Sequence, residues 1–180
     1  MHRGGTDLCG ALAANLWLST RIEGKADDNL LVTCGGTEAM LANLLVTVKP
    51  GDKVVIFETF YENFGPDSII SGATPIFVPL TPPTFQPDPE ALKAAFAQRP
   101  KIVIVNTPGN PTGRIFTDDT LRLLAELCVQ YDTLAVTDEI YEHMVYDGKH
   151  HTSLATWPGM AEPTVTLGGF GKTNTVTGWR

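Results

Sequence analysis

Short apolar runs alternate with amphipathic segments along most of the chain. Runs such as VVIF and IVIV lack the polar alternation of a half-exposed strand, and this is typical of strands buried on both faces of a sheet. We predict strands at six places: 30–34, 53–57, 74–79, 101–106, 133–138 and 164–167. Helical patterns lie between them, at 37–48, 61–71, 88–98 and 117–131.

Most of these helical segments begin at a capping residue, such as Thr37, Asp88 or Thr117. Alternation of strand and helix predicts an α/β fold in which a mostly parallel sheet is covered by helices on both sides, a three-layer sandwich. No repeat and no long linker divides the 180 residues, and 43% hydrophobic with 18% charged residues is ordinary for one globular domain.

The net charge indicates which kinds of partner to expect, and the cysteine spacing indicates the cellular compartment. Thirteen Lys and Arg against 20 Asp and Glu give a net charge of −7 without a basic block, so we expect neither nucleic acid nor a membrane as partner. Cys9, Cys34 and Cys128 lack the paired spacing of a disulfide framework or zinc site, which favours the cytoplasm. Near the N-terminus one apolar helical stretch is interrupted by polar residues, so we expect no signal peptide and no membrane span.

Gly35-Gly36-Thr37 comes directly after the predicted strand LLVTC and opens the next helical segment. Unpaired backbone N–H groups and the positive end of the helix dipole would therefore face an anion bound above the sheet. Taken alone, the motif reads more often as a tight turn followed by an N-cap.

NTPGNPTG, at 106–113, follows the predicted strand KIVIV and is more specific. Its two prolines and two glycines fix a rigid loop that can present the side-chain amide of Asn110 as a donor. An ordinary turn at the end of a strand is the alternative, but it does not require this whole run of residues.

Asp138 and Lys172 each follow a predicted strand. A carboxylate at the end of TLAVT needs a partner if it is buried, and a protonated heteroaromatic nitrogen would serve, while Tyr141 can donate to an oxygen on the same ring. Lys172, after GGFG and near Phe170, can attack an aldehyde as the free amine. The alternatives are a helix cap or metal ligand for Asp138 and a surface lysine for Lys172.

Together these motifs resemble the class I/II aminotransferases of fold type I, which use pyridoxal 5′-phosphate. The resemblance runs from about Gly10 to Arg180, and NTPGNPTG, VTDEIYEHMVYDG and GKTNTVTGWR are its strongest parts. The segments ETFYENFGPDSIISGATP and SLATWPGM are most similar to the branch with kynurenine, glutamine and methionine aminotransferases.

The resemblance implies catalytic roles for three residues. Lys172 would hold the cofactor as a Schiff base and move a proton between the substrate Cα and the cofactor C4′. Asp138 would keep the pyridine nitrogen protonated, so that the ring accepts electrons. Tyr141, together with Asn110, would bond the phenolic oxygen.

It also implies how the rest of the cofactor is held. Tyr61 would stack on the ring face, and the phosphate would be bound by Gly36, Thr37 and Arg180. Many relatives have a serine three residues before the lysine or directly before it, whereas this chain has Gly169 and Gly171. We therefore expect the phosphate to rest mainly on Arg180 and the helix end at Gly36-Thr37.

Relatives are about twice as long, so the resemblance implies a partial large domain, truncated at both ends, with the small C-terminal domain absent. That small domain normally supplies the arginine that grips the substrate α-carboxylate. The family's next strand normally lies beside LLVTC, and without it a sheet edge near the phosphate loop is exposed. We expect a parent homodimer that acts on amino acids and 2-oxo acids, and an isolated chain that is inactive or weak. A non-catalytic fragment that binds pyridoxal phosphate is the alternative.

A P-loop nucleotide-binding protein is a remote alternative, because GGFGKT resembles the end of GxxxxGK[ST]. Thr166 replaces the first glycine, the residues after Lys172 are poor helix formers, and the Asp-Glu strand precedes the lysine loop. Three histidines could suggest a metal site, but their spacing and their exposed loop favour solvated or packing roles: His143, His150 and His151.

Overall fold

The computed structural model describes residues 4–179 and is built on one six-stranded sheet. In chain order the strands are β1 Lys53–Glu58, β2 Thr74–Thr81, β3 Gln86–Pro87, β4 Ile102–Asn106, β5 Leu134–Asp138 and β6 Thr164–Leu167. Their order across the sheet is β3-β2-β1-β4-β5-β6, with β3 antiparallel to β2 and every other neighbouring pair parallel.

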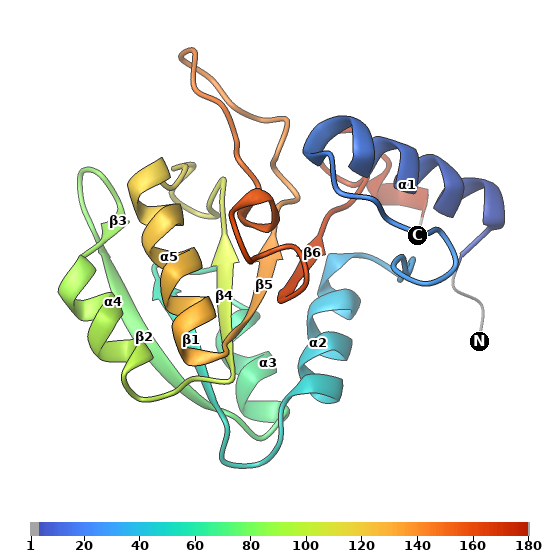
Figure 1. Cartoon of the computed structure of the whole chain (residues 1–180). Helices are drawn as coiled ribbons and strands as arrows, with labels where there is room; N and C mark the ends of the chain where they lie inside the picture. The colour runs from blue at the N-terminus through green and yellow to red at the C-terminus, as the bar shows by residue number, and fades with distance from the viewer. Residues whose placement is uncertain (1–3, 180) are drawn as a thin grey trace.

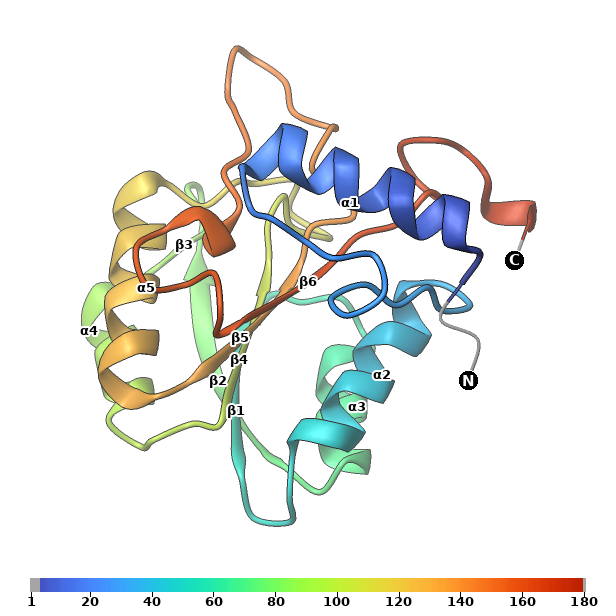
Figure 2. The same cartoon turned by 45° about the vertical axis from the view of Figure 1, so that its right-hand side comes forward.

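Helices cover both faces of this sheet. They are α1 Thr6–Thr20, α2 Gly36–Thr47, α3 Phe64–Ile70, α4 Pro89–Phe96 and α5 Asp118–Tyr131, with short 3₁₀ turns η1 Leu154–Thr156 and η2 Thr177–Trp179. Figures 1 and 2 show α4 and α5 on one face and α2 and α3 on the other. The predicted three-layer α/β sandwich is therefore confirmed. Within residues 4–179, no helix is long and apolar enough to cross a membrane.

Alternate side chains of each central strand pack into two separate hydrophobic cores, one on each face of the sheet. Val103 and Val105 on β4 pack with side chains of α4 and α5, such as Phe96 and Leu124. Ile104, between them, packs into the other core with Leu44 of α2. Because both faces are buried, the strands can be apolar at every position, and this explains the runs from which they were predicted.

The predicted strand at 30–34 is wrong. These residues are not in a strand, and among the described residues the sheet ends at β6. A strand needs a hydrogen-bonding neighbour, and no described strand lies beside this segment, so its apolar residues are not enough to place it in the sheet. Leu31 is left 60% exposed.

The predicted helix starts are correct at two of three places. Asp88 accepts a hydrogen bond from the Ala91 N–H, and Thr117 accepts one from the Thr120 N–H. For α2, however, the N-cap is Gly35, and no side chain caps it. Thr37 is the second residue inside the helix, so its assignment as a cap is wrong.

Candidate active site

A cavity of about 1190 Å³ lies beyond the carboxyl ends of β5 and β6. Its walls come from α1, residues 30–37, the start of α2, α3 and the loops that follow β4, β5 and β6. Seven of the predicted site residues line it: Gly36, Thr37, Tyr61, Asn110, Asp138, Tyr141 and Lys172. The eighth, Arg180, lies outside the described residues.

Asp138 is the last residue of β5 and faces this cavity from the sheet. Its Oδ1 accepts a hydrogen bond of 3.3 Å from the Ile140 N–H. Burial raises the pKa of the Asp138 carboxyl to about 6; the Ile140 hydrogen bond opposes this, and the charge of Glu139 adds to it. A positively charged partner in the cavity would restore the carboxylate.

Glu139, the residue after Asp138, forms a buried polar cluster with His151 and Ser153 at the end of the loop that follows β5. Glu139 is only 2% exposed, its Oε1 accepts from the Ser153 hydroxyl at 2.8 Å, and its Oε2 lies 2.8 Å from Nε2 of His151. This cluster ties both ends of residues 139–153, a loop that projects from the fold in Figure 1, to the sheet. The His151 side chain is only 8% exposed, and within residues 4–179 no group of three or more potential metal ligands gathers.

Lys172 reaches the cavity from the turn after β6. Its Nζ lies 5.7 Å from the centre of the Tyr141 ring, so the amine and the phenol predicted to act on one ligand are neighbours. The turn is held by hydrogen bonds from the Asn174 N–H to the Phe170 carbonyl and from the Thr177 hydroxyl to the Gly171 carbonyl. Within the described part of the chain no α-helix begins at Lys172, which argues against the P-loop alternative.

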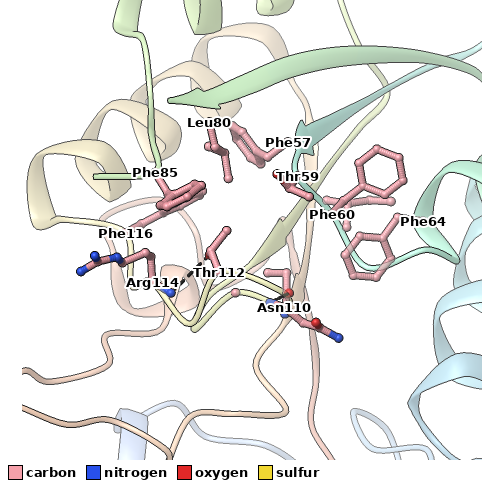
Figure 3. Close-up of a pocket in the computed structure, with 13 residues that line it drawn as sticks. Phe57, Thr59, Phe60, Phe64, Leu80, Phe85, Asn110, Thr112, Arg114 and Phe116 are labelled. Atoms are coloured by element: carbon pink, nitrogen blue, oxygen red, sulfur yellow. Dashed lines mark hydrogen bonds between the residues drawn. The ribbon is translucent and has the colours of Figure 1, made fainter. Parts of the chain in front are cut away.

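The loop of Asn110 is closed by its own backbone. The Gly113 N–H donates to the Gly109 carbonyl at 2.7 Å, and the Gly109 N–H donates to the Arg114 carbonyl at 2.8 Å. Asn110 borders the large cavity and also a second pocket of about 20 Å³. Figure 3 shows phenylalanine rings grouped around this second pocket. It is about large enough for one water molecule, so it offers no room for a substrate.

The N-terminus of α2 forms another part of the cavity wall. Gly35 has φ 95° and ψ 165°, a conformation that only glycine adopts readily. This backbone turns the chain so that Gly36 and Thr37 begin the helix at the cavity. A helix N-terminus without a side-chain cap offers N–H groups and a positive dipole end to an anion.

Gly35 and Gly36 should therefore respond differently to alanine. Gly35→Ala forces a side chain into a glycine-only conformation, and we expect it to lower the free energy of unfolding by about 1–3 kcal/mol. Gly36→Ala adds a methyl group whose nearest neighbour is the Ile140 Cδ1 at 4.0 Å, in a helical conformation, so stability should hold within about 0.5 kcal/mol. Urea unfolding of both variants measures the difference, and equal losses would contradict this account of Gly35.

Asp67 on α3 is a cavity residue for which the sequence suggested no role. It is buried, and its Oδ2 has no hydrogen-bond partner among the described residues. Burial raises the pKa of the Asp67 carboxyl, because the neutral acid is easier to keep out of water than the carboxylate. No sequence pattern marks this residue, because its burial arises from the packing of α3.

The chemistry of the donor set fits pyridoxal 5′-phosphate. A desolvated acid suits a ring nitrogen, an amide and a phenol suit a ring oxygen, a primary amine suits an aldehyde, and a helix N-terminus suits a phosphate. Asp138, Asn110, Tyr141, Lys172 and Thr37 carry these groups around one cavity.

Comparisons with known proteins point the same way. The model of the family "Aminotransferase class I and II" matches residues 3–180. Human kynurenine–oxoglutarate transaminase 1 is 41% identical over 163 residues, covering 84% of this chain and 39% of the relative. A probable N-succinyldiaminopimelate aminotransferase of Mycobacterium tuberculosis is 37% identical over 179 residues, covering 98% of this chain and 45% of the relative.

Solved structures share the fold closely. N-succinyldiaminopimelate aminotransferase from Mycobacterium tuberculosis superimposes with a TM-score of 0.95 at 37% identity, over 98% of this chain and 47% of that one. An aromatic aminotransferase from Pyrococcus horikoshii gives 0.95 at 33% identity, over 99% and 48%. The chain thus spans less than half the length of these proteins. With the family model matched along almost all of its residues, the chain belongs to the aminotransferase class I and II family.

Proposed function

We propose that this chain carries the cofactor-binding part of a pyridoxal phosphate-dependent aminotransferase, which moves an amino group from an amino acid to a 2-oxo acid. Members of this family generally depend on that cofactor. The observation that carries the proposal is the convergence of Asp138, Tyr141 and Lys172 on one cavity, which the uncapped start of α2 also lines.

When bound, the cofactor supplies an aldehyde and a ring that accepts electrons from the substrate. Lys172 would hold the cofactor through its aldehyde, and its free amine would move a proton from the substrate Cα to the cofactor C4′. Its place beside Tyr141 keeps the amine at the cavity wall.

The other site residues would hold and orient the cofactor. Asp138 would pair its carboxylate with the protonated ring nitrogen, and that pairing would offset the cost of burying the charge. Asn110 and Tyr141 would donate to the phenolic oxygen, and Tyr61 would cover one face of the ring. Gly36 and Thr37 bind the phosphate from the helix end, and we assign Arg180 to the same phosphate from its sequence match alone.

The amino acceptor is proposed from the similar proteins. One is named a kynurenine–oxoglutarate transaminase, and 2-oxoglutarate is therefore the first acceptor to try. The parent is proposed to be a homodimer in the cytoplasm, and these residues to form part of its large domain. These three points stay predictions.

Titration of the purified chain with pyridoxal phosphate tests the proposal. We expect an absorbance band near the visible edge that saturates and disappears on borohydride reduction, with the cofactor's mass added to the peptide that contains Lys172. Amino transfer from kynurenine, glutamine or methionine to 2-oxoglutarate is then assayed. A saturable band without transfer would favour the second candidate, a non-catalytic cofactor-binding fragment, which the limited coverage of the relatives supports. Nucleotide binding with no band would reject both.

A further inference from the structure

Asn106, the last residue of β4, lies outside the set of groups that would contact the cofactor. We propose that Asn106 is a positioning residue whose side chain sets the distance between Asn110 and Asp138. This inference rests on the proposed function, because it assigns Asn110 and Asp138 to one bound ring.

The side chain of Asn106 makes two hydrogen bonds, one as the donor and one as the acceptor. Its Nδ2 donates to the backbone carbonyl of Asp138 at 2.9 Å, across 32 residues of sequence. Its Oδ1 accepts from the backbone N–H of Asn110 at 2.7 Å. Asn106 and Asp138 are also register partners in the β4–β5 pair. The first bond therefore adds a side-chain contact at the end of this strand pair.

An amide makes these two bonds from two different atoms of one short side chain. Asparagine carries a donor and an acceptor on a rigid planar group, whereas aspartate carries acceptors and alanine carries neither. Both bonds have the length of a well-formed hydrogen bond. Because Asn106 is half-buried, the loss of either bond leaves a backbone group that must find another partner.

The two bonds connect the Asn110 loop to the end of β5 through one side chain, in addition to the pairing of β4 with β5. Backbone bonds close the Asn110 loop on itself, and the Glu139 cluster fixes the segment after Asp138. Asn106 bonds to both parts. A displacement of about 1 Å in a group that orients a reactant can cost about 100-fold in rate, so a fixed spacing between Asn110 and Asp138 has functional weight.

The test compares Asn106→Ala, Asn106→Asp and a matched control, Thr133→Val. Thr133 also links β4 and β5 regions through a side chain, because its hydroxyl donates to the Pro100 carbonyl at 3.0 Å, but it lies at the opposite end of the strands. Pyridoxal phosphate affinity, the absorbance maximum of the bound form, and amide hydrogen exchange of Asn110 in the cofactor-free chain are measured for each.

We expect Asn106→Ala to weaken cofactor affinity by about 10–100-fold, to shift the absorbance maximum and to speed exchange at the Asn110 N–H. Asn106→Asp keeps the acceptor for Asn110, so it should protect that N–H while still weakening affinity. Thr133→Val should lower the urea midpoint yet keep wild-type affinity and absorbance. Should Asn106→Ala not fold, Asn106→Asp carries the test alone.

Wild-type affinity and absorbance in both Asn106 variants would overturn the inference, and so would an equal loss of affinity in Thr133→Val. Failure of the proposed function is distinguished by the unsubstituted chain, which would then show no saturable band at all. That result would remove the ring that Asn110 and Asp138 are proposed to share, and would overturn the inference as well.

Discussion

Lys172→Ala is expected to abolish the cofactor absorbance band and the borohydride-dependent mass increase, while leaving the fold intact. The amine is the nucleophile that would form the bond to the cofactor aldehyde, and alanine has none. Lys172 is exposed to the cavity, so truncation buries no unpaired group and should change the free energy of unfolding by no more than about 0.5 kcal/mol. Where transfer activity is measurable, loss of the base alone should lower it by about 100–10,000-fold.

Lys149→Ala is the matched control. Lys149 is an exposed lysine in the projecting loop and does not line the cavity, so its removal should leave both the band and the mass increase unchanged. Spectrophotometric titration and mass spectrometry of the two variants distinguish them. A band that survives in Lys172→Ala but not in Lys149→Ala would place the reactive amine elsewhere.

Asp138→Asn should raise the stability of the cofactor-free chain at neutral pH and impair cofactor binding. The pKa of Asp138 is raised from 3.8 to about 6 in the folded chain, mainly by burial. The contribution of this group to stability is therefore fully present below about pH 4 and is lost as the pH rises through about 6. A difference of about 2 pKa units corresponds to as much as about 3 kcal/mol, and the variant avoids this loss because its amide never ionises.

Urea unfolding at several values between pH 4 and pH 8 measures this effect. The free energy of unfolding of Asp138→Asn relative to wild type should rise with pH across the window in which the buried carboxyl ionises. Asp147→Asn, at an exposed loop position with φ 58°, is the control for replacing a carboxylate by an amide. In the presence of pyridoxal phosphate the wild type should be the more stable of the two, because asparagine has no negative charge to pair with a protonated ring nitrogen. The loss of cofactor affinity should be about 2–5 kcal/mol. Equal affinity of variant and wild type would exclude Asp138 as the partner of that nitrogen.

The central strands could be predicted from the sequence because each has its hydrogen-bonding neighbours within this chain. VVIF and IVIV are apolar at every position since both faces of the sheet are covered, and a purely local pattern records this. The segment at 30–34 is just as apolar, but an apolar run does not specify a neighbour, and here none of the described strands pairs with it. The prediction failed because strand formation depends on a partner elsewhere in the fold.

The grouping of the site residues could be predicted for a related reason. Parallel strands bring their carboxyl ends to one edge, so motifs that follow β4, β5 and β6 must meet there. The supporting contacts could not be predicted. Asn106 reaches Asp138 across 32 residues, and Ser153 reaches Glu139 across 14, and neither spacing has a sequence signature. Arg180 lies outside the described residues, so its phosphate role stays a prediction.

The division of each central strand between two cores affects how mutations combine. Val103 and Ile104 are adjacent in the chain, yet they contact different helices on opposite sides of the sheet. Substitutions at such sequence neighbours share few partners, so their energetic effects should be close to additive. Residues two apart, such as Val103 and Val105, belong to one core and are placed to show epistasis. The separation of two residues along the chain is therefore a poor guide to whether their mutations have additive effects on stability.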